Sequence, residues 1–187
     1  MTQREEFLEL ILSNRNNVEI LERTSDLPDC WLVSGALFQT VWNVLSDREP
    51  TYGIKDYDLF YFDDTDTSYE AEDVVIKNVE KRCRDLGVEV EVRNQARVHL
   101  WYPEKFGTDY PALRSSCDAI DRFLATTCML GVQKNDHGYE VYAPLGYDDL
   151  FSQIVRGNHS DNFSEDALSK KFESWKVSWP EISWSTV

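Results

Sequence analysis

Residues 55–62 read Lys-Asp-Tyr-Asp-Leu-Phe-Tyr-Phe, with two aspartates one position apart at the start of an aromatic and aliphatic run. A β-strand turns alternate side chains to the same face, so we expect Asp56 and Asp58 to point together and Tyr57 and Leu59 to point the other way. Two neighbouring carboxylates repel, and their charge is costly beside an apolar strand unless a cation compensates it. The motif therefore predicts a site for Mg²⁺, with Mn²⁺ as an alternative, of the kind used in phosphoryl chemistry.

The segments around this strand predict an α+β fold, with a small mixed β-sheet flanked by helices, in a single domain over residues 1–187. We expect a helical N-terminus over 1–26, a core over about 30–150, and C-terminal helices over 147–177, split into 147–155 and 164–177. Within the core, hydrophobic periodicity predicts strands at 30–33, 55–62 and 88–93, helices at 36–45 and 70–86, and a hairpin made of 127–133 and 139–143. Residues 94–107 fit either a strand that continues after a bulge or a short helix that ends at Gly107.

Composition limits the partners and the compartment. The formal net charge is −15, and the sequence has no cluster of Lys and Arg dense enough to bind a long nucleic acid. We therefore do not expect a long nucleic acid as a partner. No stretch approaches the roughly 20 apolar residues of a membrane span, and the N-terminus shows no signal peptide. We therefore expect a cytoplasmic protein without a membrane partner, in which the four scattered cysteines are reduced and structural.

The junction Ser34-Gly35-Ala36 predicts a phosphate cradle. A short apolar strand ends there and a helix begins, so small residues leave the backbone N–H groups at the helix N-terminus open to an anion. A two-metal site commonly takes a third carboxylate from a neighbouring strand. Glu91, in the alternating run 88–93, is our candidate, and Glu89 on the same face is the second choice.

Together these residues resemble the nucleotidyltransferase superfamily of DNA polymerase beta. Its signature is a small-residue pair that opens a helix, an Asp-x-Asp on the next strand and a later acidic residue, which fall here on Gly35-Ala36, Asp56-x-Asp58 and Glu91. A family of small stand-alone nucleotidyltransferase-like proteins is more similar still. That similarity covers roughly residues 30–150 and is carried by the stretches 53–63, 92–102, 119–123 and 141–146. The chain departs from the superfamily pattern in having Ala36 at the second small position and a longer connection over 46–54.

The resemblance implies a Mg²⁺-dependent enzyme that binds an NTP, ATP included, and transfers its NMP group to a hydroxyl of a small molecule or a protein. Asp56, Asp58 and Glu91 would hold the metal and carry the catalysis, with Glu91 favoured over Asp58 as the base toward the acceptor. Ser34, Gly35 and Ala36 would bind phosphate. In the segment after Glu91, Arg97 would pair with a phosphate and Asn94 would bond the sugar or the base of the nucleotide. Two alternatives remain open: a non-catalytic nucleotide-binding or protein-interaction module on the same fold, and a metal-dependent phosphohydrolase.

Overall fold

The computed structural model describes residues 1–185. Its α-helices are α1 (Gln3–Leu12), α2 (Arg15–Thr24), α3 (Gly35–Leu45), α4 (Tyr69–Cys83), α5 (Val98–Phe106), α6 (Ser116–Ile120), α7 (Asp148–Phe151) and α8 (Glu165–Ser178). Its strands are β1 (Trp31–Val33), β2 (Asp56–Tyr61), β3 (Glu89–Asn94), β4 (Gly131–Asn135), β5 (Gly138–Tyr142), β6 (Ile154–Arg156) and β7 (Ser183–Ser185).

Five strands form the main sheet in the order β3-β2-β1-β4-β5. β2 and β3 run parallel, as expected for two strands joined by a crossover helix, here α4; the other neighbours are antiparallel. The mixed sheet flanked by helices confirms the predicted fold class.

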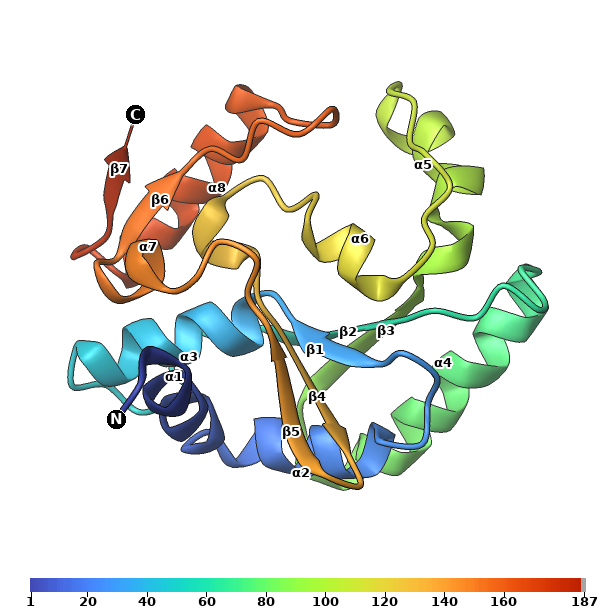
Figure 1. Ribbon diagram of the computed structural model, residues 1–187, viewed down its shortest axis with the longest axis horizontal. Coiled ribbons are helices and arrows are strands. Elements are labelled where there is room, and N and C mark those ends of the chain that lie inside the picture. Colours follow the sequence, from blue (N-terminus) through green and yellow to red (C-terminus); the bar gives the residue numbers. More distant parts are fainter. Residues whose placement is uncertain (186–187) are drawn as a thin grey trace.

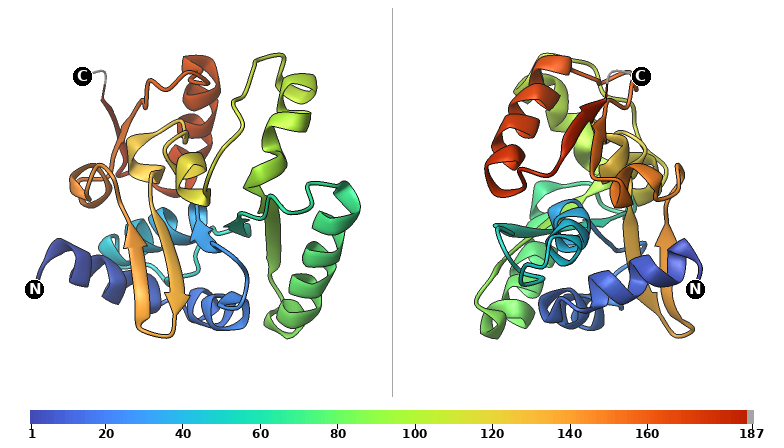
Figure 2. Two further views of the ribbon diagram at one scale, coloured as in Figure 1. Left: turned by 45° about the vertical axis from the view of Figure 1, so that its right-hand side comes forward. Right: turned by 90° about the vertical axis from the view of Figure 1, so that its left-hand side faces the viewer.

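Helices lie on both sides of this sheet (Figure 1). α1 to α4, from the first half of the chain, lie on one side, and α6, α7 and α8 lie on the other; Figure 2 shows the same division from two further directions. The short strands β6 and β7 pair in parallel beside α8. The later helices thus stand over the sheet face that carries the aspartates.

Alternation along β2 sets the two faces of the sheet. Tyr57, Leu59 and Tyr61 are buried in the main core, while Asp56, Asp58 and Phe60 point to the opposite face and are partly exposed. The hydroxyl of Tyr57 accepts hydrogen bonds from the side-chain amides of Asn14 and Asn16 at the start of α2. The period-two pattern of the sequence is confirmed, because one face must be buried.

The structure decides the secondary structure of two segments, 94–107 and 147–155. Residues 94–107 form a short 3-10 turn and then α5, which ends at Gly107 in the left-handed conformation, so the helical alternative is the correct one. The predicted helix over 147–155 is wrong in its second half. α7 ends at Phe151, Gln153 has a φ of 53° that a helix does not tolerate, and Ile154 begins β6. This segment is a strand because it pairs with β7, where Ile154 lies opposite Ser183. Local sequence does not indicate this pairing, because β7 lies far along the chain.

None of the helices in residues 1–185 combines the length and the apolar composition that crossing a membrane requires.

Candidate active site

Four carboxylates lie on one face of the sheet, on two neighbouring strands. Asp58 of β2 pairs in register with Glu91 of β3, and Asp56 pairs with Glu89. Since paired residues of parallel strands turn their side chains to the same face, all four carboxylates share the face that faces the later helices. The structure therefore brings Glu91, rather than Glu89, directly beside Asp58, as the sequence predicts.

The pKa of the Asp58 carboxyl group is raised above its usual value. Burial raises its pKa to about 6, and the charges of Asp56 and Glu91 act in the same direction. A hydrogen bond with Ser34 and the ammonium group of Lys171 lower the pKa and oppose this only in part. Asp58 is thus a carboxylate held where its own charge is unfavourable, which is typical of functional sites.

The phosphate cradle begins at a strained residue. Ser34 precedes α3 with φ 61° and ψ −143°, a conformation normally left to glycine, and its side chain does not cap the helix. The backbone N–H groups of Gly35 and Ala36, in the first turn of α3, have no partner within the helix and are oriented outward along its axis. Ser34 and Gly35 line the cavity described next, whereas Ala36 is buried in the core.

A cavity of about 450 Å³ connects the cradle with the aspartates. Its walls come from the ends of β1 and β2, the first turns of α3, the connection 46–54 through Gly53, and the last turns of α8. Asp56 and Asp58 line it together with Lys55 and Lys171. Within residues 1–185 neither lysine has an ion-pair partner, so both charges are available to an anionic ligand.

Sequence reasoning gave no role to Lys55, Lys171, Trp175 and Trp179, which all line the cavity. α8 presents Lys171, Trp175 and Ser178 to the cavity, three residues at the spacing of one helix face. That spacing is visible in the sequence. What the sequence does not show is that this face packs over the aspartates more than a hundred residues away.

Arg97 and Asn94 are not brought to the cavity. The Arg97 guanidinium forms an ion pair with the buried carboxylate of Glu72 and donates to the carbonyl of Thr67. The Asn94 side chain is buried and is held by backbone groups of Asp63 and Ala96. Both residues hold the loop after β2 against the end of β3, and we assign neither a role toward a nucleotide.

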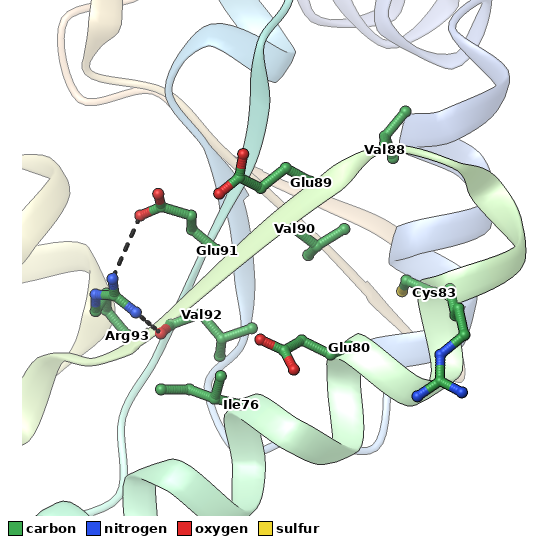
Figure 3. Close-up of a pocket in the computed structure, with 10 residues that line it drawn as sticks. Ile76, Glu80, Cys83, Val88, Glu89, Val90, Glu91, Val92 and Arg93 are labelled. Carbon is green, nitrogen blue, oxygen red and sulfur yellow. Dashed lines mark hydrogen bonds and ion pairs between the residues drawn. The ribbon is translucent and has the colours of Figure 1, made fainter.

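The third carboxylate, that of Glu91, contacts Arg93 and does not line the cavity of the aspartate pair. Figure 3 shows Glu91 directed toward Arg93, whose Nη2 lies 3.5 Å from the Glu91 carboxylate. Glu91 lines a separate surface pocket between β3 and α4, and no group of three His, Cys, Asp or Glu side chains in residues 1–185 is close enough to hold a metal ion. The structure therefore presents two of the three predicted ligands in the cavity and the third on the adjacent strand.

The residues present nevertheless fit a Mg²⁺ ion. Mg²⁺ prefers oxygen ligands and commonly takes one or two carboxylates, with phosphates and water completing the shell. The raised pKa of Asp58 reflects a buried negative charge that Ser34 and Lys171, among residues 1–185, compensate only in part. Asp56 and Asp58 would hold the ion.

Comparisons with known proteins agree with this geometry. A family model described as nucleotidyltransferase matches residues 21–184. A search of curated proteins found no matching relative. Among solved structures, one described as an NMR structure that reveals a CCA-adding enzyme head domain superposes with a TM-score of 0.75 at 23% identity, over 98% of this chain and 96% of that chain. At that identity the likeness shows the fold alone, which this chain shares with that head domain. The match of the family model over most of the chain shows that this protein belongs to the nucleotidyltransferase family.

Proposed function

We propose that this protein is a Mg²⁺-dependent nucleotidyltransferase that moves an NMP group from an NTP to a hydroxyl of a small molecule or a protein. One observation carries the proposal: an aspartate pair with compensating cations and an open helix N-terminus line the same cavity. Nucleotidyl transfer needs this combination, because it depends on positioning and on charge neutralisation around the phosphates.

Each group has a defined task. The N–H groups of Gly35 and Ala36 and the ammonium groups of Lys55 and Lys171 would bind the phosphates. Asp56 and Asp58 would hold a Mg²⁺ ion, which when bound would supply Lewis-acid stabilisation of the charge that develops on the phosphate oxygens. Lys171 also faces Asp58, so it helps to balance the aspartate charge before substrate arrives.

The proposed transfer forms one bond, breaks one bond and moves one proton. The acceptor oxygen attacks the α-phosphorus, the bond to the bridging oxygen between the α- and β-phosphates breaks, and pyrophosphate leaves. The acceptor proton goes to the Glu91 carboxylate, which is adjacent to Asp58 in the register of the sheet. Glu91 would have to exchange its contact with Arg93 for one with the acceptor.

The products test the proposal. With Mg²⁺ and an NTP labelled at the α-phosphate, we expect label on the acceptor and one pyrophosphate released per transfer, measured over a panel of small hydroxyl compounds and the protein itself. Release of inorganic phosphate in place of pyrophosphate would instead identify a phosphohydrolase that uses the same carboxylates.

A second candidate function is nucleotide binding without turnover. The observation that favours it is the Glu91–Arg93 contact, which occupies the predicted base. Under this alternative the protein binds Mg²⁺·NTP without turning it over. The Arg93→Met variant, which frees Glu91, should then also show no turnover. If the protein is a transferase, we expect Glu91→Gln to lower its rate. Glu89→Gln, two residues earlier on the same face of β3, is the matched control.

Lys171→Met is expected to raise the KM for the NTP about tenfold, with a smaller effect on kcat. Lys171 lines the cavity and forms no ion pair among residues 1–185, although its charge also acts on Asp58, so we expect it to act mainly on the bound phosphates. One charge-assisted hydrogen bond is worth about 1.5–3 kcal/mol, and 1.4 kcal/mol corresponds to about tenfold. Steady-state kinetics measures the change. The neighbouring exposed Lys170, changed to Met, should leave KM unaltered; equal effects of both substitutions would mean that only overall charge matters.

A further inference from the structure

A second, smaller pocket opens beside the carboxylate cavity. It has a volume of about 130 Å³ and lies between α3, α8 and the segment 122–125. The two spaces share Ser34, Phe38, Lys171 and Trp175 as walls. A ligand whose phosphates lie at Ser34 and Lys171 can therefore extend into the smaller pocket.

The two spaces differ in chemistry. The larger cavity is lined by carboxylates, ammonium groups and serines, which suits a metal-bound polyphosphate. The smaller pocket is walled mainly by apolar side chains, among them Phe38, Phe123, Leu124 and Trp175. A triphosphate would lose its hydration there without compensation, whereas a flat, weakly polar ring system would not. The volume is also well below the roughly 300–1,000 Å³ of a pocket that encloses a whole drug-sized ligand.

Arg122 is the one strongly polar donor that lines this pocket and not the carboxylate cavity; it also borders a surface pocket beside the segment 111–114. Its Nη1 atom is buried and has no hydrogen-bond partner among residues 1–185, and its guanidinium lies 5.4 Å from the centre of the Tyr110 ring. A guanidinium only donates hydrogen bonds and stays charged at any working pH. An unsatisfied buried donor is costly, which points to a ligand that brings an acceptor atom.

The segment that carries Arg122 is held in place. The side chain of Asn158 donates to the carbonyls of Asp121 and Phe123, each at 2.8 Å, and that of Asn162 donates to the carbonyl of Arg122 at 3.2 Å. The ring of Phe123 stacks on that of Phe60 from β2, with centroids 5.6 Å apart. The pocket is thus formed before a ligand binds, which lowers the entropic cost of binding.

We propose that this pocket binds the nucleobase of the NTP and that Arg122 selects bases with an exocyclic carbonyl oxygen, namely guanine, cytosine and uracil, over adenine. The inference rests on the proposed function, since it assigns the base of the same NTP. A carbonyl oxygen accepts a hydrogen bond from the guanidinium, whereas the exocyclic group of adenine is an amino group that only donates, so adenine offers no acceptor other than its ring nitrogens. A site built to hydrogen-bond one group discriminates strongly against an analogue that lacks it.

Calorimetry with non-hydrolysable Mg²⁺·NTP analogues of the four bases tests this. We expect the wild-type protein to bind the guanine, cytosine and uracil analogues about tenfold or more tightly than the adenine analogue. Arg122→Met should remove this difference by weakening the three favoured analogues, and should leave the affinity for Mg²⁺·tripolyphosphate unchanged. Arg114→Met is the matched control, because the Arg114 side chain is 93% exposed and does not line the pocket.

The outcomes separate the alternatives. Wild-type protein that binds all four analogues equally, or adenine most tightly, overturns the inference without any variant being needed. An Arg122→Met protein that loses tripolyphosphate affinity as much as NTP affinity also overturns it, since Arg122 would then hold phosphate. Binding of no analogue at all overturns the proposed function and this inference with it, while binding without base discrimination overturns this inference alone.

Discussion

Asp58→Asn is expected to lower nucleotidyl transfer by about a thousandfold and, at the same time, to make the protein more stable at neutral pH. The loss of rate follows from removing a ligand of the Mg²⁺ ion, whose Lewis-acid effect is worth several kcal/mol at about 1.4 kcal/mol per tenfold. Initial rates of pyrophosphate release measure it. Asp64→Asn is the matched control, because Asp64 is exposed on the loop after β2 and away from the cavity.

The gain in stability follows from the pKa of Asp58, which burial raises to about 6. A carboxyl group with a raised pKa binds its proton more tightly in the folded chain than in the unfolded one. Its ionisation therefore costs stability as pH rises from about 4 through about 6, and the full cost is present above that range. Two pKa units correspond to at most about 3 kcal/mol, so we expect the variant to gain about 2 kcal/mol at pH 7.5.

Denaturant unfolding without metal measures this gain. The difference between Asp58→Asn and wild type should be near zero at pH 4 and grow to its full value by pH 7.5, while Asp64→Asn should show no such rise. A variant that is less stable than wild type at pH 7.5 would mean that the hydrogen bond to Ser34 outweighs the burial and repulsion of the charge.

Asn43→Leu is expected to destabilise the fold by about 3 kcal/mol and to raise the KM for the NTP. The Asn43 side chain is fully buried on α3, donates to the carbonyls of Pro50 and Tyr52, and accepts from the indole of Trp179 at 2.7 Å. Leucine would leave the buried indole N–H of Trp179 unpaired, at a cost of about 1–3 kcal/mol, and would also remove the bonds to the two loop carbonyls, whose contributions do not add fully. KM should change because the tethered loop and Trp179 both border the cavity.

Chemical denaturation and steady-state kinetics check the two effects. Asn78→Leu is the matched control: it makes the same exchange on the exposed face of α4, where the change should stay within about 0.5 kcal/mol. If Asn43→Leu lowers stability while KM stays constant, the loop 46–54 borders the site without shaping it.

Local patterns were sufficient for the part of the site that lies on the sheet. The alternation of β2 and β3 fixes which side chains share a face, and parallel pairing then places Glu91 beside Asp58. The cradle followed from the same reasoning, because a strand that ends at Ser34 and a helix that begins at Gly35 are local events.

The rest of the site depends on contacts between distant segments. Lys171 reaches the cavity only because α8 packs over α3, where Trp175 lies against Phe38 and Trp42. Arg97 has the chemistry of a phosphate ligand, but Glu72 of α4 takes its charge. The spacing of residues in a single sequence does not predict such contacts, because they depend on how the helices pack against the sheet.

The most direct test of the central claim, that Asp56 and Asp58 hold a metal-bound nucleotide, is calorimetric titration of a non-hydrolysable NTP with and without Mg²⁺. We predict binding by the wild-type protein that requires Mg²⁺ and disappears with a chelator. Asp56→Asn should lose this requirement for Mg²⁺ together with most of the affinity, although it unfolds as cooperatively as wild type. Wild-type protein that binds the nucleotide equally well without Mg²⁺, or an Asp56→Asn protein that binds it as the wild type does, would contradict the account.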